Sequence, residues 1–474
     1  MSYEIVDSKP GEECGVFGIY STKDIEVSSL IYLGIHSLQH RGQESAGMAI
    51  VQGEKMNLHK DNGLVDNVVS EEIIDQLKGN KGIGHVRYST TGSSQIINAQ
   101  PLLINSAKGS VALAHNGNLI NGKELRSFLE KNGSIFHSEL DTEVIAHLIA
   151  RSPASDIEGA LADSLNQIKG AFSLVILTKD KLMGVRDPRG FRPLILGEFE
   201  DGYVLASETS ALEIIEADHV RDIQPGEMII IDDNGYNIER YQPKVEANFC
   251  VFEYIYLARP DSKFNGNNVQ KVRQEMGRQL ARETENQDDI DIVSPVPDSG
   301  ISAAQGFAWE ADKPFQFSLI RNKYVGRTFI SPVQKIRNLK VKMKLNPVKE
   351  IVAGKKVALV DDSIVRGTTS RQLVSMLKEA GAKEVHIMIS SPPVTNPCYY
   401  GLDISTRQEL IASEKEVEDI RKEIGADSLT YLSLEGLSKI MEDRESGYCD
   451  ACFSGDYPTV IGDDLQGEGC RREK

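Results

Sequence analysis

The sequence predicts a two-domain protein in which a layered α+β domain precedes an α/β domain with a parallel sheet. Three observations support this prediction. First, the chain of 474 residues is longer than the size at which a single hydrophobic core stops growing. Second, short strand-like segments cluster in the first half. Third, apolar strands alternate with helical stretches after about residue 240, which is typical of a parallel sheet.

The first half contains strand signals separated by turn signals. Residues 171–177 and 182–185 flank a polar turn at 178–181 and predict a β-hairpin. Further strands are expected at 110–115, 194–196 and 203–206, with a turn at 200–202 between the last two. Helices are expected at 30–39 and 141–150. Strands in clusters with segregated helices indicate a layered α+β arrangement.

The second half changes character after a boundary near residues 241–249, which divides the chain into domains at 14–245 and 246–474. Strands are expected at 293–296, 356–360 and 385–389. Further along, Ser413 and Glu416 predict a capping box at the start of a helix. That helix is expected to end at Gly425, because glycine favours the left-handed cap.

Composition limits the possible functions. A formal charge of −17 argues against non-specific binding of nucleic acid, because phosphates would be repelled on average. No apolar run is long enough to cross a bilayer, and residues 1–13 lack the features of a secretion signal. Six cysteines in so long a chain do not suggest a disulfide scaffold. These observations predict a cytoplasmic protein without membrane or nucleic-acid partners.

Residues 356–370 form the strongest local pattern, which runs from a strand through an acidic pair and a glycine-containing loop into a helix. Asp361 and Asp362 follow the strand at its carboxyl end, where open α/β sheets bind ligands. Residues 368–370 begin the helix, where free N–H groups attract phosphate. The alternative is a solvated acidic turn before a capped helix, but the complete order of the pieces favours a ligand site.

This segment resembles the phosphoribosyl pyrophosphate motif of the type I phosphoribosyltransferases, whose catalytic domain is an α/β fold with a parallel sheet. The resemblance implies that Asp361 and Asp362 bind ribose and Mg²⁺. The loop 297–300 is similar to the family's pyrophosphate loop and adds Ser299 to the Mg²⁺ environment. The residues that the resemblance assigns to the 5′-phosphate are Arg366, Gly367, Thr368, Thr369 and Ser370.

A basic stretch lies between these two loops, at residues 321–330 and 340–344. Lys323, Arg327 and Lys344 are its candidate contacts to phosphoribosyl pyrophosphate. In an acidic protein such a stretch suits a lid that neutralises pyrophosphate and excludes water. A solvated basic loop is a competing interpretation, because charge runs are common on surfaces.

Cys14 stands at the start of an apolar run. A buried cysteine is usually only a small hydrophobic residue, but the position of this one suggests more. Removal of residues 1–13 as a propeptide would give Cys14 a free α-amine, whose reference pKa of about 8 suits a general base. One residue would then supply both the nucleophile and its base.

Three further motifs, at residues 39–45, 84–92 and 114–118, accompany Cys14. Together they resemble the class II glutamine amidotransferase domain, an N-terminal-nucleophile (Ntn) hydrolase that folds as a layered αββα sandwich. The resemblance implies that Cys14 is the nucleophile and that Asn116 and Gly117 form the oxyanion hole. It further assigns Arg87 to binding of the glutamine carboxylate and Asp141 to binding of the α-amine. It also implies that Arg41 and Thr90 help to order the pocket.

The remaining cysteines include a closely spaced pair, Cys449 and Cys452, and two distant ones, Cys250 and Cys398. Four thiolates in one closed site permit zinc or an iron–sulfur cluster. A reactive dithiol or four unrelated buried thiols are the simpler alternatives. Cys470 has no evident role.

The two domains in this order resemble the family of glutamine phosphoribosylpyrophosphate amidotransferases from Cys14 to about Gly462. The resemblance is to the Bacillus-like branch, which implies a short propeptide and a [4Fe–4S] cluster bound by the four cysteines named above. In this family, ammonia freed from glutamine passes through a sheltered passage and displaces pyrophosphate. The product is 5-phosphoribosylamine, in the first committed step of purine synthesis. The resemblance also implies a homotetramer and inhibition by purine nucleotides.

Two alternative functions are considered. Another class II amidotransferase, such as a glucosamine-phosphate or asparagine synthase, would lack the motif at residues 361–369. A non-catalytic, purine-sensing regulator with the phosphoribosyltransferase fold would have no need of a complete pocket around Cys14. Pyrophosphate release that depends on glutamine discriminates between the enzyme and the regulator.

Overall fold

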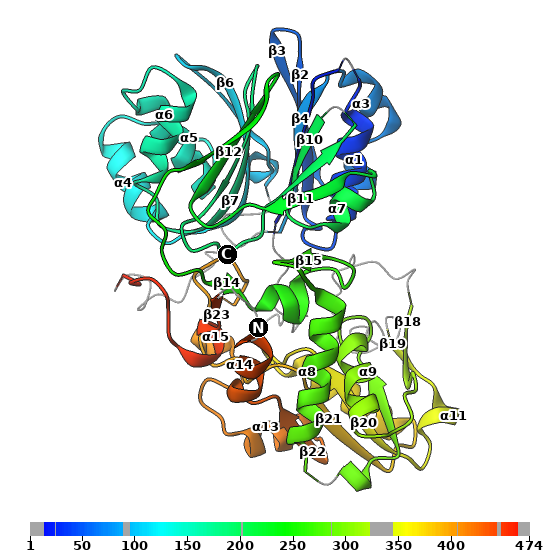
Figure 1. Ribbon diagram of the computed structural model, residues 1–474. Helices are drawn as coiled ribbons and strands as arrows, with labels where there is room; N and C mark the ends of the chain where they lie inside the picture. The colour runs from blue at the N-terminus through cyan, green and yellow to red at the C-terminus, as the bar shows by residue number, and fades with distance from the viewer. Residues whose placement is uncertain are drawn as a thin grey trace.

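The computed structural model describes residues 14–23, 25–88, 95–200, 202–285, 287–322, 345–404, 406–442 and 447–462. The chain forms an upper part built from two sheets and a lower part built around one parallel sheet (Figure 1). Several predicted features lie outside the described residues, namely the propeptide 1–13, Thr90, Lys323, Arg327, Lys344 and Cys470.

The first half consists of two antiparallel sheets. The seven-stranded sheet has the order β11-β9-β10-β1-β4-β2-β3. Its strands are β1 (Gly15–Ser21), β2 (Ser45–Gln52), β3 (Lys55–Asn62), β4 (Lys81–Arg87), β9 (Ile195–Phe199), β10 (Gly202–Ala206) and β11 (Asp218–Asp222). The six-stranded sheet has the order β13-β12-β8-β7-β6-β5. Its strands are β5 (Leu102–Ser106), β6 (Gly109–Leu119), β7 (Gly170–Leu177), β8 (Leu182–Arg186), β12 (Glu227–Asp232) and β13 (Gly235–Arg240).

Three layers of core hold this half together. Side chains of both sheets, among them Val16, Ala114 and Val175, pack against one another between the sheets. The outer face of the seven-stranded sheet packs on α1 (Ser28–Ser37), α2 (Val65–Val68), α3 (Glu71–Gln76) and α7 (Ser210–Glu213). The outer face of the other sheet packs on α4 (Gly122–Lys131), α5 (Asp141–Arg151) and α6 (Ile157–Leu165). The predicted αββα sandwich is confirmed.

The second half contains a parallel sheet of order β17-β20-β21-β22, as predicted. Its strands are β17 (Ile292–Pro295), β20 (Lys356–Asp361), β21 (Glu384–Ile389) and β22 (Ser428–Tyr431). Alternate side chains of β20 enter two different cores, Ala358 and Val360 on one face and Val357 and Leu359 on the other. One core is completed by α8 (Val269–Glu283), α9 (Ile301–Glu310) and α14 (Leu434–Glu442), and the other by α11 (Lys349–Val352), α12 (Thr368–Glu379) and α13 (Val417–Ile424).

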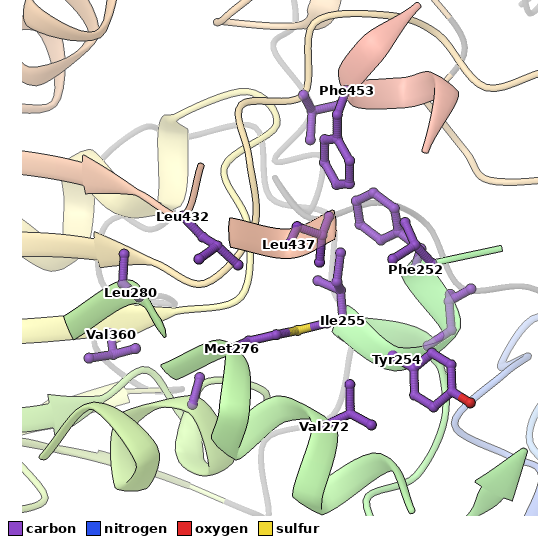
Figure 2. Close-up of a cluster of buried hydrophobic side chains, with 14 of the residues drawn as sticks. Phe252, Tyr254, Ile255, Val272, Met276, Leu280, Val360, Leu432, Leu437 and Phe453 are labelled. Atoms are coloured by element: carbon purple, nitrogen blue, oxygen red, sulfur yellow. The ribbon is translucent and has the colours of Figure 1, made fainter. Parts of the chain in front are cut away.

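The end of the chain returns to the junction between the halves. There, β14 (Phe249–Cys250) pairs in parallel with β23 (Tyr448–Cys449), and α15 (Ala451–Ser454) follows. Phe252 and Phe453 stack with ring centroids 5.4 Å apart. Figure 2 shows this aromatic contact at one end of a core that continues to Met276 and Leu280 of α8. The C-terminal segment is therefore part of the second half's core.

The local predictions had mixed outcomes. The hairpin at 178–181 is confirmed, because β7 and β8 pair antiparallel. The helix ending at Gly425 is also confirmed, since Gly425 has a φ of 76°. The capping box is wrong. Glu416 precedes α13 without a capping side-chain hydrogen bond, and the Ser413 hydroxyl donates instead to the Leu410 carbonyl in the preceding turn.

Candidate active sites and cysteine cavity

Cys14 lies directly before β1, a strand in the middle of the seven-stranded sheet. Its side chain is partly buried, and its thiol donates to the Tyr88 carbonyl at 3.7 Å. Its own carbonyl accepts a hydrogen bond from Arg41 Nε at 3.1 Å. The nucleophile candidate is therefore held both through its backbone carbonyl and through its thiol.

The opposite sheet brings the predicted oxyanion residues to the same end of the sandwich. Val16, two residues after Cys14, and Ala114, two residues before Asn116, share the core between the sheets. Asn116 is fully buried, and neither atom of its side-chain amide has a hydrogen-bond partner among the described residues. A buried amide without a partner is costly, so its presence points to a ligand that completes it.

Gly117 adjoins this amide in a conformation that favours glycine. Its φ is 143°, and a Cβ atom there would lie 2.1 Å from the Ala171 carbonyl oxygen on β7. Any larger residue would push β6 away from β7. The close approach explains why the Asn-Gly pair occurs here inside a strand, although the same dipeptide elsewhere usually forms a turn.

Asp141 begins α5 and is anchored from two directions. It accepts a hydrogen bond from the Leu119 N–H at 3.0 Å, and His115 Nδ1 lies 3.3 Å from its other oxygen. Burial alone would raise the pKa of Asp141, but His115 and the backbone donors outweigh it and hold that pKa below its ordinary value. The carboxylate therefore stays ionised, as binding of an α-ammonium group requires.

Arg87, at the end of β4, is buried and lies 3.6 Å from Glu44. Because β4 pairs directly with β1, with Val86 opposite Gly15, this guanidinium lies at the same sheet end as Cys14. The predicted residues Cys14, Arg87, Asn116, Gly117 and Asp141 thus come from four separate elements that meet at this end. His115, which the sequence motif contains without an assigned role, joins them through Asp141.

The second candidate site lies at the carboxyl edge of the parallel sheet. Asp361 ends β20, and both it and Asp362 are buried. Asp361 accepts a hydrogen bond from the Asp362 N–H at 2.9 Å, and Asp362 accepts one from the Ser363 hydroxyl at 2.6 Å. Such a turn fixes the directions of both carboxylates at the edge where open α/β sheets bind ligands.

Gly367 forms the turn that leads from these carboxylates into α12. Its φ is 73°, and a Cβ atom would lie 2.6 Å from Ile411. Thr368 begins the helix, so the free N–H groups of residues 368–370 face the loop, as a phosphate site requires. Arg366 pairs with Glu409 at 2.6 Å.

Ser299 belongs to the loop between β17 and α9, which meets the first loop. The register of the sheet places Pro295 beside Val360, so both strands end at the same level. Gly300 packs so tightly that a Cβ atom would lie 2.4 Å from the Val360 carbonyl oxygen. The loop containing Ser299 and the loop containing Asp361 are therefore neighbours at one edge of the sheet.

The four cysteines predicted to bind a cluster line one small cavity. Cys250 and Cys449 are paired neighbours on β14 and β23, and Cys398 and Cys452 complete the set. Burial raises the pKa of Cys449 to about 12, because a thiolate there would be desolvated. Cys398 Sγ accepts a hydrogen bond from the Tyr400 N–H at 3.3 Å.

The cavity belongs to both halves, because Phe191 of the first half also lines it. Four thiols around one space fit a cluster that takes one thiolate per iron. Within the described ranges, no group of three or more His, Cys, Asp or Glu side chains converges closely enough to hold a single metal ion.

No helix in the described part of the chain is long and apolar enough to cross a membrane.

The sequence motifs did not include two buried carboxylates near Cys14, Glu208 and Glu253, both of which pair with Arg41. Their sequence context offers no signal, since the partners are separated by 167 and 212 positions. Only the fold brings them together.

Comparisons with known proteins agree with both halves. A glutamine amidotransferase domain matches residues 85–214, and a phosphoribosyl transferase domain matches residues 267–412. The amidophosphoribosyltransferase of Bacillus subtilis is 50% identical over 455 residues, which cover 95% of each chain. That of Methanocaldococcus jannaschii is 48% identical over 465 residues, covering 94% of this chain and 98% of the relative.

Two solved structures extend this similarity to the fold. One is the glutamine phosphoribosylpyrophosphate amidotransferase of B. subtilis complexed with ADP and GMP. It has a TM-score of 0.90 and 49% identity, covering 95% of this chain and 98% of that one. The other is described as the allosteric regulatory enzyme of purine biosynthesis. It has a TM-score of 0.91 and 49% identity, covering 95% of this chain and 97% of that one.

Proposed function

We propose that this chain, which belongs to the amidophosphoribosyltransferase family, divides its reaction between the Cys14 site and the Asp361–Asp362 site. The chain catalyses the glutamine-dependent conversion of phosphoribosyl pyrophosphate to phosphoribosylamine in purine biosynthesis. In this proposal, residues 14–245 form the glutaminase and residues 246–474 the transferase. The observation that carries the assignment is the buried Asn116 amide without a described partner, at the same end of the sandwich as Cys14.

At the first site, the Cys14 sulfur attacks the side-chain amide carbon of glutamine. Removal of residues 1–13 provides the α-amine that takes the thiol proton. The Asn116 side chain and the Gly117 N–H donate to the oxyanion of the tetrahedral intermediate. Arg87 binds the α-carboxylate of glutamine, Asp141 binds its α-ammonium group, and Arg41 and Thr90 order the pocket. Ammonia leaves, and water hydrolyses the glutamyl thioester to glutamate.

At the second site, ammonia attacks C1 of phosphoribosyl pyrophosphate and pyrophosphate leaves. The residues at 366–370 hold the 5′-phosphate, and Lys323, Arg327 and Lys344 contact the pyrophosphate. Asp361, Asp362 and Ser299 offer oxygen ligands for Mg²⁺, which when bound would stabilise the charge of the departing pyrophosphate. The chain itself mainly orients the two reactants and excludes water, so that ammonia is not protonated on its way between the sites.

The cysteine cavity supports a further part of the proposal. Cys250, Cys398, Cys449 and Cys452 fit a [4Fe–4S] cluster with a structural role, because the reaction transfers no electrons. We also place the enzyme in the cytoplasm as a homotetramer. Inhibition by purine nucleotides is supported by the solved relative that contains ADP and GMP.

The test is pyrophosphate release by anaerobically purified protein with Mg²⁺ and phosphoribosyl pyrophosphate, with glutamine or ammonium as the donor. Release is expected with both donors. Cys14→Ser is expected to abolish the glutamine-dependent reaction and leave the ammonium-dependent rate within about twofold, because the second site is untouched. Loss of both activities in a folded Cys14→Ser protein would contradict the division of labour. Release with neither donor in the wild type would favour the regulator.

A further inference from the structure

A buried group of charges joins the two halves next to Cys14. The Arg41 side chain is fully buried between two carboxylates, Glu208 of the first half and Glu253 of the second. Its Nη1 lies 2.6 Å from Glu208. Glu253 accepts from Nη1 at 3.0 Å and from Nη2 at 2.7 Å, one bond to each carboxylate oxygen. This two-bond geometry orients the guanidinium plane, which a single contact could not do.

The same guanidinium holds the candidate nucleophile. Arg41 Nε donates to the Cys14 carbonyl at 3.1 Å. Because the guanidinium is rigid and planar, the two hydrogen bonds from Nη1 and Nη2 to Glu253 also fix the direction in which Nε donates. A rotation of the plane would bend or break this hydrogen bond and so release the backbone of Cys14, and small displacements of a reacting group cost large factors in rate.

Glu253 is itself held by the core of the second half. It begins the π-helical turn η2 (Glu253–Leu257), and π-helical turns are often found at functional sites. Arg273 of α8 donates to the Tyr254 carbonyl at 2.6 Å and to the Ala258 carbonyl at 2.8 Å, which secures both ends of the turn. Figure 2 shows Tyr254 and Ile255 in the core formed with α8.

The first half secures the other side of the same joint. Glu208 accepts hydrogen bonds from the Ser262 hydroxyl at 2.6 Å and the Arg259 N–H at 3.0 Å, both donors coming from the second half. Arg192 of the first half lies 3.6 Å from Glu253 and donates to the Tyr400 carbonyl at 2.7 Å. Each half thus contributes a carboxylate that is bound by groups of the other.

We propose that Glu253 is a positioning residue of the glutaminase site, supplied by the transferase half: it orients Arg41, and through Arg41 it fixes the carbonyl of Cys14. The proposal rests on the proposed role of Cys14 as the nucleophile. A purely stabilising role is a weaker explanation, because a buried ion pair typically adds little stability compared with apolar residues of similar volume. The arrangement makes reactivity of Cys14 depend on correct docking of the two halves.

The test compares Glu253→Gln with wild type in the glutamine-dependent and ammonium-dependent reactions. We expect Glu253→Gln to lower kcat with glutamine by about 10- to 100-fold, as loss of a residue that orients an active-site group typically does. The KM for glutamine is expected to change less than about threefold, because Glu253 does not contact Arg87 or Asp141, the residues proposed to bind glutamine. The ammonium-dependent rate should stay within about twofold of wild type.

A readout independent of turnover is the rate at which iodoacetamide alkylates Cys14, located by peptide mapping. It should fall in Glu253→Gln in parallel with kcat. The matched control is Glu283→Gln. Glu283 is also a carboxylate of the second half that accepts two hydrogen bonds from one residue, in this case Ser433, but it makes no contact with Arg41. It should behave as wild type in both assays. If Glu253→Gln does not fold, Glu253→Asp retains the charge but shortens the reach, and the same pattern is expected of it.

An equal loss of both reactions would overturn the proposal, because Glu253 would then serve the fold in general. Unchanged glutamine-dependent turnover and alkylation would overturn it as well. The Cys14→Ser variant, assayed alongside, separates this inference from the function on which it rests. Glutamine-dependent activity in Cys14→Ser would refute the nucleophile itself. The expected loss in Cys14→Ser together with a wild-type Glu253→Gln would refute only the role of Glu253.

Discussion

The two candidate sites are assembled in opposite ways. The transferase site takes its carboxylates and its phosphate loop from one continuous segment, residues 361–370, at the end of β20. The glutaminase site takes Cys14, Arg87, Asn116 and Asp141 from four elements spread over more than a hundred positions, and its neighbour Arg41 is oriented by a residue of the other half. The transferase site is formed by residues that are neighbours in the sequence, at a sheet edge, whereas the glutaminase site is formed by packing between layers.

This difference has consequences for how each site should respond to change. In the local site, the important groups depend mainly on the strand, the turn and the helix that carry them. In the packed site, a buried group such as the Asn116 amide is positioned by the pairing of β6 with β7 and by the core between the two sheets. Substitutions should therefore separate the two sites clearly when both donors are assayed.

The largest effect is expected for Asp361→Asn. It should lower both the glutamine- and ammonium-dependent reactions by about a thousandfold, because it removes a proposed ligand of Mg²⁺, an ion that would stabilise several kcal/mol of transition-state charge. Steady-state pyrophosphate release measures it. Asp289→Asn is the matched control, because Asp289 lies exposed near the other end of β20, where it pairs with Lys356. An ammonium-dependent rate that survives Asp361→Asn would remove this residue from the site.

Asn116→Ala should affect one reaction only. Loss of one oxyanion donor is expected to lower kcat with glutamine by about a hundredfold, while the ammonium-dependent rate remains unchanged. Asn105→Ala, on the neighbouring strand β5 and exposed, provides the control. If Asn116→Ala raised the KM for glutamine without lowering kcat, Asn116 would bind substrate and would not stabilise the oxyanion.

His115→Gln should change substrate binding and its pH dependence. His115 holds the pKa of Asp141 down, and without it burial would raise that pKa. Because glutamine's α-ammonium needs the ionised carboxylate, KM should rise about tenfold at acidic pH and less at higher pH, where Asp141 is ionised again. Profiles of KM against pH test this prediction. His59→Gln is the control, because His59 lies on β3, where its ring contacts the Val68 carbonyl at 2.8 Å. A parallel shift at every pH would contradict the electrostatic role.

The smallest effect is expected for Glu409→Gln. The ion pair between Arg366 and Glu409 is partly exposed, so its removal should change the free energy of unfolding by about 0–1 kcal/mol. The KM for phosphoribosyl pyrophosphate should stay within about twofold. A larger change would mean that Glu409 sets the position of Arg366, and that the transferase site also depends on distant residues. Thermal unfolding and steady-state kinetics provide the measurements.

Much of this architecture was predictable because its signals are local. The turn before α12, the hairpin at 178–181 and the parallel strands depend on neighbouring residues, and the structure confirms them. The capping box at Ser413 failed because α13 begins three residues later than predicted, with Glu416 in place of Ser413 at the N-cap position. The glutaminase residues were predicted through their resemblance to a family, since spacing alone could not bring β1, β4 and β6 together.

By itself the sequence predicted many of the strands and helices and a candidate phosphate loop, because periodicity, turn residues and helix starts act over a few positions. Only the tertiary structure decided that four cysteines share one cavity, that His115 holds Asp141, and that Glu253 reaches Arg41 from the other half. These contacts join residues that are distant in the chain. They exist because buried charges and polar groups must find partners inside the fold, and the packing of the layers determines which partners are near.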